Sequence, residues 1–430
     1  MLGSWIFALP RPSTPSVKVI ELSPPRQFVA AEAARPFRVL LQASSSSLMR
    51  LLYLCDADGG GMAEYAIRQF HVLSNQGVEV TFLCRPTFEI QRLQREIVLP
   101  ELPKAPARHA AALVRLFRQI RDSRTVMRIA ADTALKGDYD GLLFACYREY
   151  FSPFWALFLR RAASKGLIIG TVAHDPVRDF ALGPAWWHRW SVRMGYSFVR
   201  HVFVHDTTPV DFGGIRPQHL SVHVIPHGPY EVPAPTQERA ALRDHYGFED
   251  EDTVFLSFGQ IRDGKNLDRF LRVMPELPEA VKLFVAGSGE AASQRPPEYY
   301  VRLAGELGIA HRCVWDLRYI PDAEAGNVFE MADHILLTYS GKFHSASGVL
   351  NAAAACRRSV LASSGPGPLK SSVEDYHLGV YVPPDDDGQI LEGARRLISR
   401  AIHPEWKRYE QENSWERNAR GVIEVFSGAS

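Results

Sequence analysis

The sequence lacks the features that most quickly assign a chain to a class: an excess of charge of one sign, a cysteine pattern and a long apolar run. Its 430 residues hold 49 Lys and Arg against 48 Asp and Glu, so the formal net charge is only +1. This balance gives no overall field that would attract a polyanion, and no nucleic-acid partner is expected. The length suits two or three globular domains of roughly 100 to 200 residues each.

The five cysteines lie far apart and form neither a CxxC pair nor a Cys/His spacing that would bind a metal. This usage favours a reduced, cytoplasmic protein in which the cysteines have no catalytic role. The nearest candidate for a membrane span, residues 151–173, is interrupted by Arg160, Arg161 and Lys165. An integral membrane protein is therefore not expected, because a spanning helix needs about 20 apolar residues.

Residues 1–48 are rich in proline, and no basic segment precedes their short apolar run. We expect a flexible N-terminal extension here rather than a secretory signal. Met49 is a second candidate for the start of the chain.

From residue 51 onward, short apolar runs alternate with amphipathic stretches. The run LLYLC is followed by a glycine-rich turn and by an apolar stripe at helical spacing between Met62 and Leu73. Repetition of this pattern predicts right-handed βαβ units and a parallel sheet in an N-terminal domain at residues 49–226.

A second series of the same kind, with an expected helix at residues 267–277 and an expected strand CVWDLRYI, follows a proline-rich connection between Pro226 and Pro235. It predicts a second α/β domain at residues 227–400, and residues 401–430 have the pattern of a C-terminal helix. The fold class is therefore α/β, with two doubly wound Rossmann-like domains. Ligands of such sheets bind beyond the carboxyl ends of the strands, so we expect the site in a cleft between two facing domains.

Gly59, Gly60 and Gly61 lie between the first strand and its helix. Glycines allow close approach of a ligand to the backbone, and the helix N-terminus offers N–H groups. The motif has neither the GxGxxG spacing of a dinucleotide site nor the GK[ST] of a P-loop, which disfavours both functions. A tight turn without a ligand is the alternative interpretation.

His174 and Asp175 end the strand GLIIGTVA, and His205 with Asp206 ends the next one. Polar residues at this end of a strand are placed to reach a ligand. His174 is a candidate hydrogen-bond donor, acid or base, since imidazole titrates near neutrality. A structural histidine remains the alternative.

Two loops of the second domain are candidates for a phosphate site. FGQIRDGKN places Arg262 and Lys265 after the first strand, where two cations would neutralise a diphosphate. Residues 345–348, Ser-Ala-Ser-Gly, precede a helix near Val349, and Ser347 and Gly348 would receive phosphate oxygens with its free N–H groups. A solvated charged loop and a capping turn without a ligand are the alternatives.

Together these segments resemble the GT-B glycosyltransferases of family 4, also called glycosyl transferases group 1, from about Leu51 to Arg400. The matching pieces are the Gly59–Gly61 loop, His174, VIPHG, FGQIRDGKN, VAGSG and the strand–loop–helix that leads to SVLASS. The resemblance implies that the first domain binds the acceptor and the second a nucleotide-sugar donor. Arg262 and Lys265 would then hold the diphosphate, and Gly287 would border the base.

The family usually carries two glutamates eight positions apart, where this chain has Phe343 and Asn351. A neutral Asn351 can still hydrogen-bond a donor hydroxyl, whereas Phe343 cannot. The departure leaves three hypotheses: a divergent subgroup that uses Ser347, Gly348 and Val349 differently, a changed donor preference, or lost catalysis. We favour the first.

The resemblance further implies retaining transfer by front-face attack, in which the leaving diphosphate assists deprotonation of the acceptor hydroxyl. Cations and a helix N-terminus would stabilise that leaving group, so no metal and no other cofactor is expected. The sequence Asp56-Ala57-Asp58 matches DxD, but its position in the glycine loop disfavours metal binding.

Trp186, Trp187 and Trp190 lie close to Arg189, Arg193 and Arg200. Aromatic and cationic residues together suggest a helix at a membrane interface, as a lipid-linked saccharide acceptor at the inner face of the membrane would require. A core-facing helix with snorkelling arginines is the alternative.

Other functions remain open. A GT-B-fold sugar-nucleotide epimerase and a nucleotide-sugar-binding pseudo-enzyme are the main competitors. A phosphorylase and an exported sugar-binding protein are less well supported, since neither a pyridoxal-lysine signature nor a signal sequence is evident.

Overall fold

The computed structural model describes residues 48–57, 61–85, 96–99, 112–146, 149–177, 183–289 and 294–428. The predicted extension up to residue 47 lies outside this range, as do Gly59 and Gly60. Within the described range, no helix combines the length and the apolar content that crossing a bilayer requires.

The first sheet has seven parallel strands in the order β3-β2-β1-β4-β5-β6-β7. The strands are β1 (Arg50–Leu54), β2 (Glu79–Cys84), β3 (Glu96–Val98), β4 (Gly141–Phe144), β5 (Ile168–Val172), β6 (His201–Val204) and β7 (Ser221–Val224). The central strands are apolar on both faces because helices cover both sides of the sheet.

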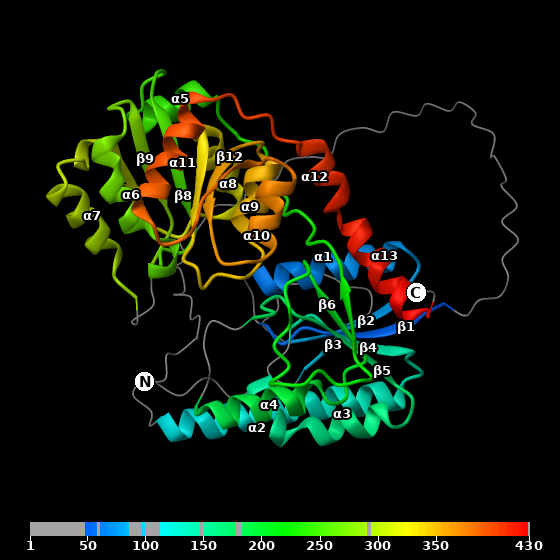
Figure 1. The fold of residues 1–430 in the computed structure, drawn as a ribbon. Coiled ribbons are helices and arrows are strands. Elements are labelled where there is room, and N and C mark those ends of the chain that lie inside the picture. Colours follow the sequence, from blue (N-terminus) through cyan, green and yellow to red (C-terminus); the bar gives the residue numbers. More distant parts are fainter. Residues whose placement is uncertain are drawn as a thin grey trace, which may run out of the picture. The chain divides into compact units, whose positions relative to one another are not determined.

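Two groups of helices cover the faces of this sheet (Figure 1). On one face lie α2 (Ala112–Lys136), α3 (Ala156–Ala163) and α4 (Ala185–Tyr196), together with the short helix η1 (Glu149–Phe154). On the other lie α1 (Gly61–Asn75) and α13 (Trp415–Phe426). The predicted helix with its apolar stripe between Met62 and Leu73 is thus confirmed, and it ends at Asn75, before Gly77, which has φ +88°.

The second sheet has six parallel strands in the order β10-β9-β8-β11-β12-β13. The strands are β8 (Thr253–Phe258), β9 (Val281–Ala286), β10 (Cys313–Asp316), β11 (His334–Thr338), β12 (Ser359–Ser363) and β13 (Gly379–Tyr381). Two doubly wound parallel sheets are present, as the sequence predicts.

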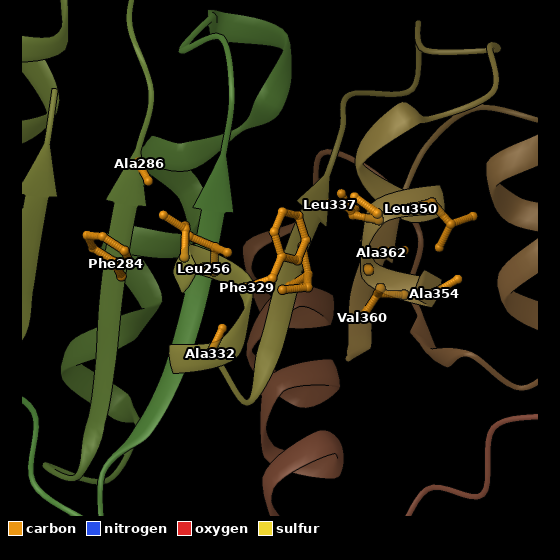
Figure 2. Packing of buried hydrophobic residues seen from close by; sticks show 14 of the residues in the cluster. Leu256, Phe284, Ala286, Phe329, Ala332, Leu337, Leu350, Ala354, Val360 and Ala362 are labelled. Carbon is orange, nitrogen blue, oxygen red and sulfur yellow. The ribbon is translucent and has the colours of Figure 1, made fainter. Parts of the chain in front are cut away.

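Helices cover both faces of the second sheet as well. One face packs against α8 (Asp322–Met331), α9 (Gly348–Ala355) and α10 (Pro368–Asp375), with α5 (Arg239–His245) beside them. Figure 2 shows part of this core, where Leu256, Phe329 and Leu350 lie among the strands and helices. The other face packs against α6 (Leu267–Val273), α7 (Pro297–Glu306) and α11 (Asp387–Ser399).

The structure differs from the sequence prediction at several elements. The stretch 267–277 forms α6 and then a separate turn η3 (Met274–Glu276) with Pro275 inside it. The run CVWDLRYI is a strand only over its first four residues. Residues 401–430 contain two helices, α12 (Trp406–Glu412) and α13, because Ser414 caps the start of the second one.

Candidate functional site

Each sheet changes the direction of its strand order at one point, and several of the predicted site residues lie there. In the second sheet this point is between β8 and β11, which are neighbours from which the chain leaves toward opposite edges. The loops after these strands are joined by a hydrogen bond from the Ser340 N–H to the Gly264 carbonyl, 2.9 Å. Doubly wound sheets bind ligands at such switch points.

Lys265 lies in the loop after β8 and directs its ammonium group back toward that strand. Its Nζ donates to the Phe258 carbonyl at 2.5 Å. Burial, and after it the charge of Arg262, lowers the pKa of Lys265 to about 7. No carboxylate of the described residues pairs with this ammonium. A buried cation without a counter-ion is unfavourable, so the site suits an anion.

Arg262 lies over two stacked rings rather than beside a carboxylate. Its Cζ is 5.9 Å from the Tyr339 centroid and 5.8 Å from that of Phe343. The two ring centroids are 4.1 Å apart at an interplanar angle of 18°. Phe343 replaces the family's first glutamate, so the guanidinium here has a cation–π contact where a carboxylate would otherwise be near. Both cations of the loop therefore remain available to a ligand anion.

The helix α9 begins at the predicted position with a capped first turn. The Ser347 hydroxyl accepts from the Leu350 N–H at 3.3 Å, and the Tyr339 hydroxyl lies 3.2 Å from it. The N–H groups of Gly348 and Val349 belong to this turn and have no acceptor inside the helix. The capping turn that the sequence suggested is present, and phosphate binding by it stays a prediction.

The side chain of Asn351 is buried and makes contacts within the protein. Its side chain is only 3% exposed. Its Nδ2 lies 3.0 Å from His227 Nδ1, which itself donates to the Gly228 carbonyl at 2.8 Å, and its Oδ1 accepts from the Tyr409 hydroxyl at 2.7 Å. Asn351 thus ties α9 to the connection between the sheets and to α12. Its predicted contact with the donor would require one of these bonds to be exchanged.

Gly287 follows β9 and lies against the backbone of the loop after β8. Its φ is +155°, and a Cβ at this position would be 1.9 Å from the Gly259 carbonyl oxygen. Only glycine, which has no Cβ, allows the two backbones to come this close, so the structure alone explains a glycine at position 287. Its predicted contact with the base is not tested by this geometry.

His174 lies at the carboxyl end of β5 with both ring nitrogens near protein atoms. Its Nε2 donates to the Ala145 carbonyl at 3.0 Å, and its Nδ1 is 3.2 Å from His205 Nε2. Since His205 Nδ1 faces the Ile225 carbonyl at 3.2 Å, the two nitrogens between the rings are both acceptors when the rings are neutral.

Burial is the main cause that lowers the pKa of His174 to about 3 and that of His205 well below its usual value. His227 adds to both shifts. Both rings are therefore neutral at neutral pH. The role of His174 as an acid, base or donor to substrate stays a prediction, because its N–H is bonded to Ala145.

Tyr230, which the sequence analysis did not single out, contacts both candidate helix starts. Its hydroxyl donates to the Gly61 carbonyl at 3.3 Å. A Cβ at Gly348 would lie 2.9 Å from its ring. The connection after β7 thus brings a tyrosine to the starts of α1 and α9. The local sequence HGPY contains no pattern that would predict this contact. Asp175 likewise accepts a hydrogen bond from Ser345 in the loop before α9.

The first switch point lies between β1 and β4. Gly61 begins α1 here, whereas the geometry of Gly59 and Gly60 is outside the described residues. Asp56 is buried and pairs with Arg85 at 2.5 Å. No group of three or more His, Cys, Asp or Glu side chains with metal-binding geometry occurs in the part of the chain that is described.

The two doubly wound sheets, each with polar loops at its switch point, define a GT-B-type scaffold. Solved structures agree in fold. The Anabaena protein HepE in complex with UDP and glucose superposes with a TM-score of 0.64 and 13% identity, covering 88% of this chain and 100% of that one. Sucrose-phosphate synthase from Thermosynechococcus elongatus gives 0.63 and 15%, covering 89% and 99%.

Residues 238–422 match the sequence model of the family Glycosyl transferases group 1. This part of the chain carries the second sheet and most of α13. The resemblance to GT-B glycosyltransferases is therefore confirmed, whereas family 4 stays a prediction.

Curated relatives are named as glycosyltransferases. D-inositol 3-phosphate glycosyltransferase of Rhodococcus jostii is 28% identical over 45% of this chain and 44% of its own length. The enzyme of that name from Mycobacterium sp. strain KMS is 31% identical over 38% of this chain and 36% of its own length. The chain thus spans less than half of the relatives it matches.

Proposed function

We propose that this protein is a retaining glycosyltransferase that moves a sugar from a nucleotide-sugar donor to a saccharide or lipid-linked saccharide acceptor. Polysaccharide or glycoconjugate biosynthesis in the cytoplasm, at the inner face of the membrane, is the setting we infer. Support comes from the group 1 domain, from relatives named as glycosyltransferases and from fold neighbours solved with UDP and with UDP-glucose.

One observation supports the donor site: two cations that pair with no carboxylate among the described residues lie beside a capped helix start. Arg262 and Lys265 are in the loop after β8, and Ser347 and Gly348 follow the neighbouring β11. A diphosphate is the anion that two adjacent cations and a helix N-terminus together can neutralise. The first-domain residues Gly59–Gly61 and His174 would approach the transferred sugar and the acceptor.

In the proposed reaction the acceptor hydroxyl attacks the anomeric carbon on the face that the diphosphate leaves. The bond from that carbon to the diphosphate oxygen breaks, and the departing diphosphate takes the hydroxyl proton. Arg262, Lys265 and the α9 N-terminus stabilise the charge that grows on the leaving oxygens. The proposal needs no metal ion or other cofactor, because the chain supplies this positive charge.

A second candidate is a protein that binds the nucleotide sugar without transferring it. Phe343 stacks on Tyr339 where the family has a glutamate, and the amide of Asn351 is bonded to His227 and Tyr409. Both family carboxylates are thus replaced by side chains with structural contacts.

Thermal stabilisation by UDP, GDP, ADP, CMP and their sugar conjugates tests the donor site, because a ligand of the folded state raises its stability. We expect one nucleotide series to shift the melting temperature. Lys265→Ala should weaken that binding about tenfold to a hundredfold, the loss of one charge-assisted hydrogen bond. Arg302→Ala, which removes an exposed arginine from α7, is the matched control.

A transfer assay distinguishes the glycosyltransferase from the protein that only binds the nucleotide sugar. With the stabilising donor and a panel of saccharides, NMR of the anomeric proton should show a product with the configuration of the donor. Stabilisation without any transfer or donor hydrolysis would favour the second candidate. The absence of stabilisation across the whole panel would contradict both.

A further inference from the structure

The layer of α2, α3 and α4 on the first sheet carries apolar side chains on its outer side. Trp186 and Trp190 of α4 are 60% and 45% exposed, and Phe117 of α2 and Leu157 of α3 are each 69% exposed. Large apolar side chains gathered on one exposed surface are characteristic of an interaction site. Trp187, by contrast, is only partly exposed and packs against Phe154, so it belongs to the support of this surface.

The spacing shows that each helix has one outward stripe. On α4 the exposed residues Trp186, Arg189, Trp190 and Arg193 recur at intervals of three and four. On α2 the stripe runs Val114, Phe117, Arg121, Arg124 and Arg128. On α3 it is Leu157 and Arg161. We call these eleven side chains the basic–aromatic face.

The three helices form one continuous layer, visible below the first sheet in Figure 1. Arg124 of α2 donates to the Phe154 carbonyl at 3.2 Å and lies 5.2 Å from the Phe158 ring of α3. Arg160 of α3 donates to Ser197, just after α4, at 2.8 Å. The stripes therefore belong to one surface rather than to separate helices.

Positive charge is concentrated in this layer. The three helices contain ten Arg and Lys but only two Asp, although the whole chain has a formal net charge of +1. Both aspartates are already paired, Asp122 with Arg121 and Asp132 with Arg128. Among the described residues, no carboxylate pairs with Arg161 or Arg189.

We propose that the basic–aromatic face binds the surface of an anionic lipid bilayer. Tryptophan is suited to the boundary between headgroups and acyl chains, and arginines beside it would pair with lipid phosphates. A second copy of this chain is a poorer occupant, because contact through the same face would bring two strongly positive surfaces together. The proposal extends the membrane hypothesis from one helix to three and names the charge of the lipid.

The test is sedimentation of the purified full chain with vesicles of phosphatidylcholine alone or with about 30 mol% phosphatidylglycerol. We expect binding to the anionic vesicles that is about tenfold or more tighter than to the neutral ones. Raising the salt to about 0.5 M should weaken it strongly, because exposed charges are then screened.

Two double variants separate the contribution of the tryptophans from that of the arginines. Trp186→Ser with Trp190→Ser should weaken binding to anionic vesicles about tenfold or more. Arg189→Glu with Arg193→Glu should remove the preference for anionic lipid. The matched control, Val301→Ser with Arg302→Glu, changes one exposed apolar residue and one exposed arginine on α7 of the other sheet and should bind as wild type.

Three results would overturn the proposal: no sedimentation with anionic vesicles, equal binding by wild type and both face variants, or a dimer that the tryptophan variant dissociates while vesicles are ignored. Circular dichroism melting checks that the variants fold. The nucleotide-induced melting shift should persist in the tryptophan variant, since α2, α3 and α4 contribute no residue to the donor loops after β8 and β11. Failure of membrane binding thus leaves the donor-site proposal standing, and the converse also holds.

Discussion

Lys265 is a residue whose chemistry the structure changes in the neutral pH range. A solvent-exposed lysine is charged throughout the neutral range, whereas burial beside Arg262 lowers the pKa of this one to about 7. Its charge therefore depends on pH where the protein would work. A bound diphosphate stabilises the protonated form and raises that pKa again.

We predict that affinity for the donor falls as the pH rises from about 6 to 8.5, because free Lys265 loses its proton over this interval. The phosphates of a nucleotide sugar are diesters and do not titrate near neutrality, so the ligand does not contribute to the change. Titration calorimetry at several pH values measures the effect. Lys265→Arg should bind with little pH dependence, because guanidinium stays charged. An equally steep profile in that variant would assign the titration to another group.

Asn351 tests whether a position of the family motif has become structural. Asn351→Ala takes the acceptor Oδ1 from the buried Tyr409 hydroxyl and removes the contact with His227 Nδ1, which keeps the Gly228 carbonyl as its partner. We predict a loss of about 1 to 3 kcal/mol in the free energy of unfolding and little change in donor affinity. Urea unfolding and calorimetry give the two numbers. Unchanged stability with tenfold weaker donor binding would instead make Asn351 a ligand of the donor.

The sequence could predict which candidate residues directly follow a strand, but it could not predict the contacts that residues make with distant partners. Arg262, Lys265 and Ser347 could be located because the carboxyl ends of neighbouring parallel strands share one edge. The partners of Asn351 lie 124 and 58 residues away in sequence. Such contacts are set by tertiary packing, which no local pattern encodes. The contacts of Tyr230 with the starts of α1 and α9 depend on tertiary packing in the same way.

At the scale of elements, the buried strands could be predicted, whereas the edge strands β3, β7 and β13 could not, and the edge strand β10 was predicted longer than it is. Central strands such as β4 are buried at every position, so they read as apolar runs. The edge strands β3 and β13 have three residues each, and β7 has a half-exposed polar pattern. A side chain that faces solvent need not be apolar, so an exposed strand does not appear in the sequence as an apolar run. A strand of three residues is also too short to show the alternation of apolar and polar residues.

The turn after β9 provides a prediction at this scale. Gly287→Ala would place a Cβ 1.9 Å from the Gly259 carbonyl at φ +155°, so the two loops must separate. We predict a loss of about 3 kcal/mol or more in stability, from backbone strain and overpacking together.

Gly305→Ala is the matched control. It lies in α7, and a Cβ there meets nothing within 4 Å. Alanine favours a helix over glycine, so this variant should gain about 0.5 to 1 kcal/mol. Thermal unfolding of both variants compares them, and equal melting temperatures would refute the close-approach argument.

At the scale of the whole molecule, buried neutral histidines make stability depend on pH. Burial is the largest cause that lowers the pKa of His174 to about 3 and those of His227 and His334 to about 4. The unfolded chain, with histidine pKa values near 6.5, binds more protons below that pH. The free energy of unfolding should therefore fall as the pH drops from about 6.5 toward 4.

Each such histidine contributes a slope of up to about 1.4 kcal/mol per pH unit. Urea unfolding at pH 7.5, 6 and 5 measures the total. His334→Gln, outside the candidate site, should reduce the slope by the share of one histidine. A stability that is flat or rises on acidification would show that these rings are charged in the folded protein.

The end of the chain completes the core of the first sheet. After the second sheet, α13 returns to pack against α1, and its residues from Trp415 to Phe426 join the same apolar cluster as β1. The Phe426 ring occupies the space left by Gly141 of β4 and Gly170 of β5, where a Cβ would come within 2.3 and 2.9 Å of it. These two glycines and the ring are thus complementary, so the first sheet should need the last helix in order to fold stably.

We predict that Phe426→Ala lowers the free energy of unfolding by about 3 to 5 kcal/mol, the usual cost of deleting a buried phenylalanine side chain. Phe117→Ala, at a 69% exposed phenylalanine on the opposite side of the same sheet, should change it by less than about 0.5 kcal/mol. Residues 48–226 expressed alone should expose this apolar surface and bind a hydrophobic dye, and a peptide of residues 413–428 added in trans should suppress the binding. If the fragment were stable and dye-free without the peptide, α13 would be an accessory to the first sheet rather than part of its core.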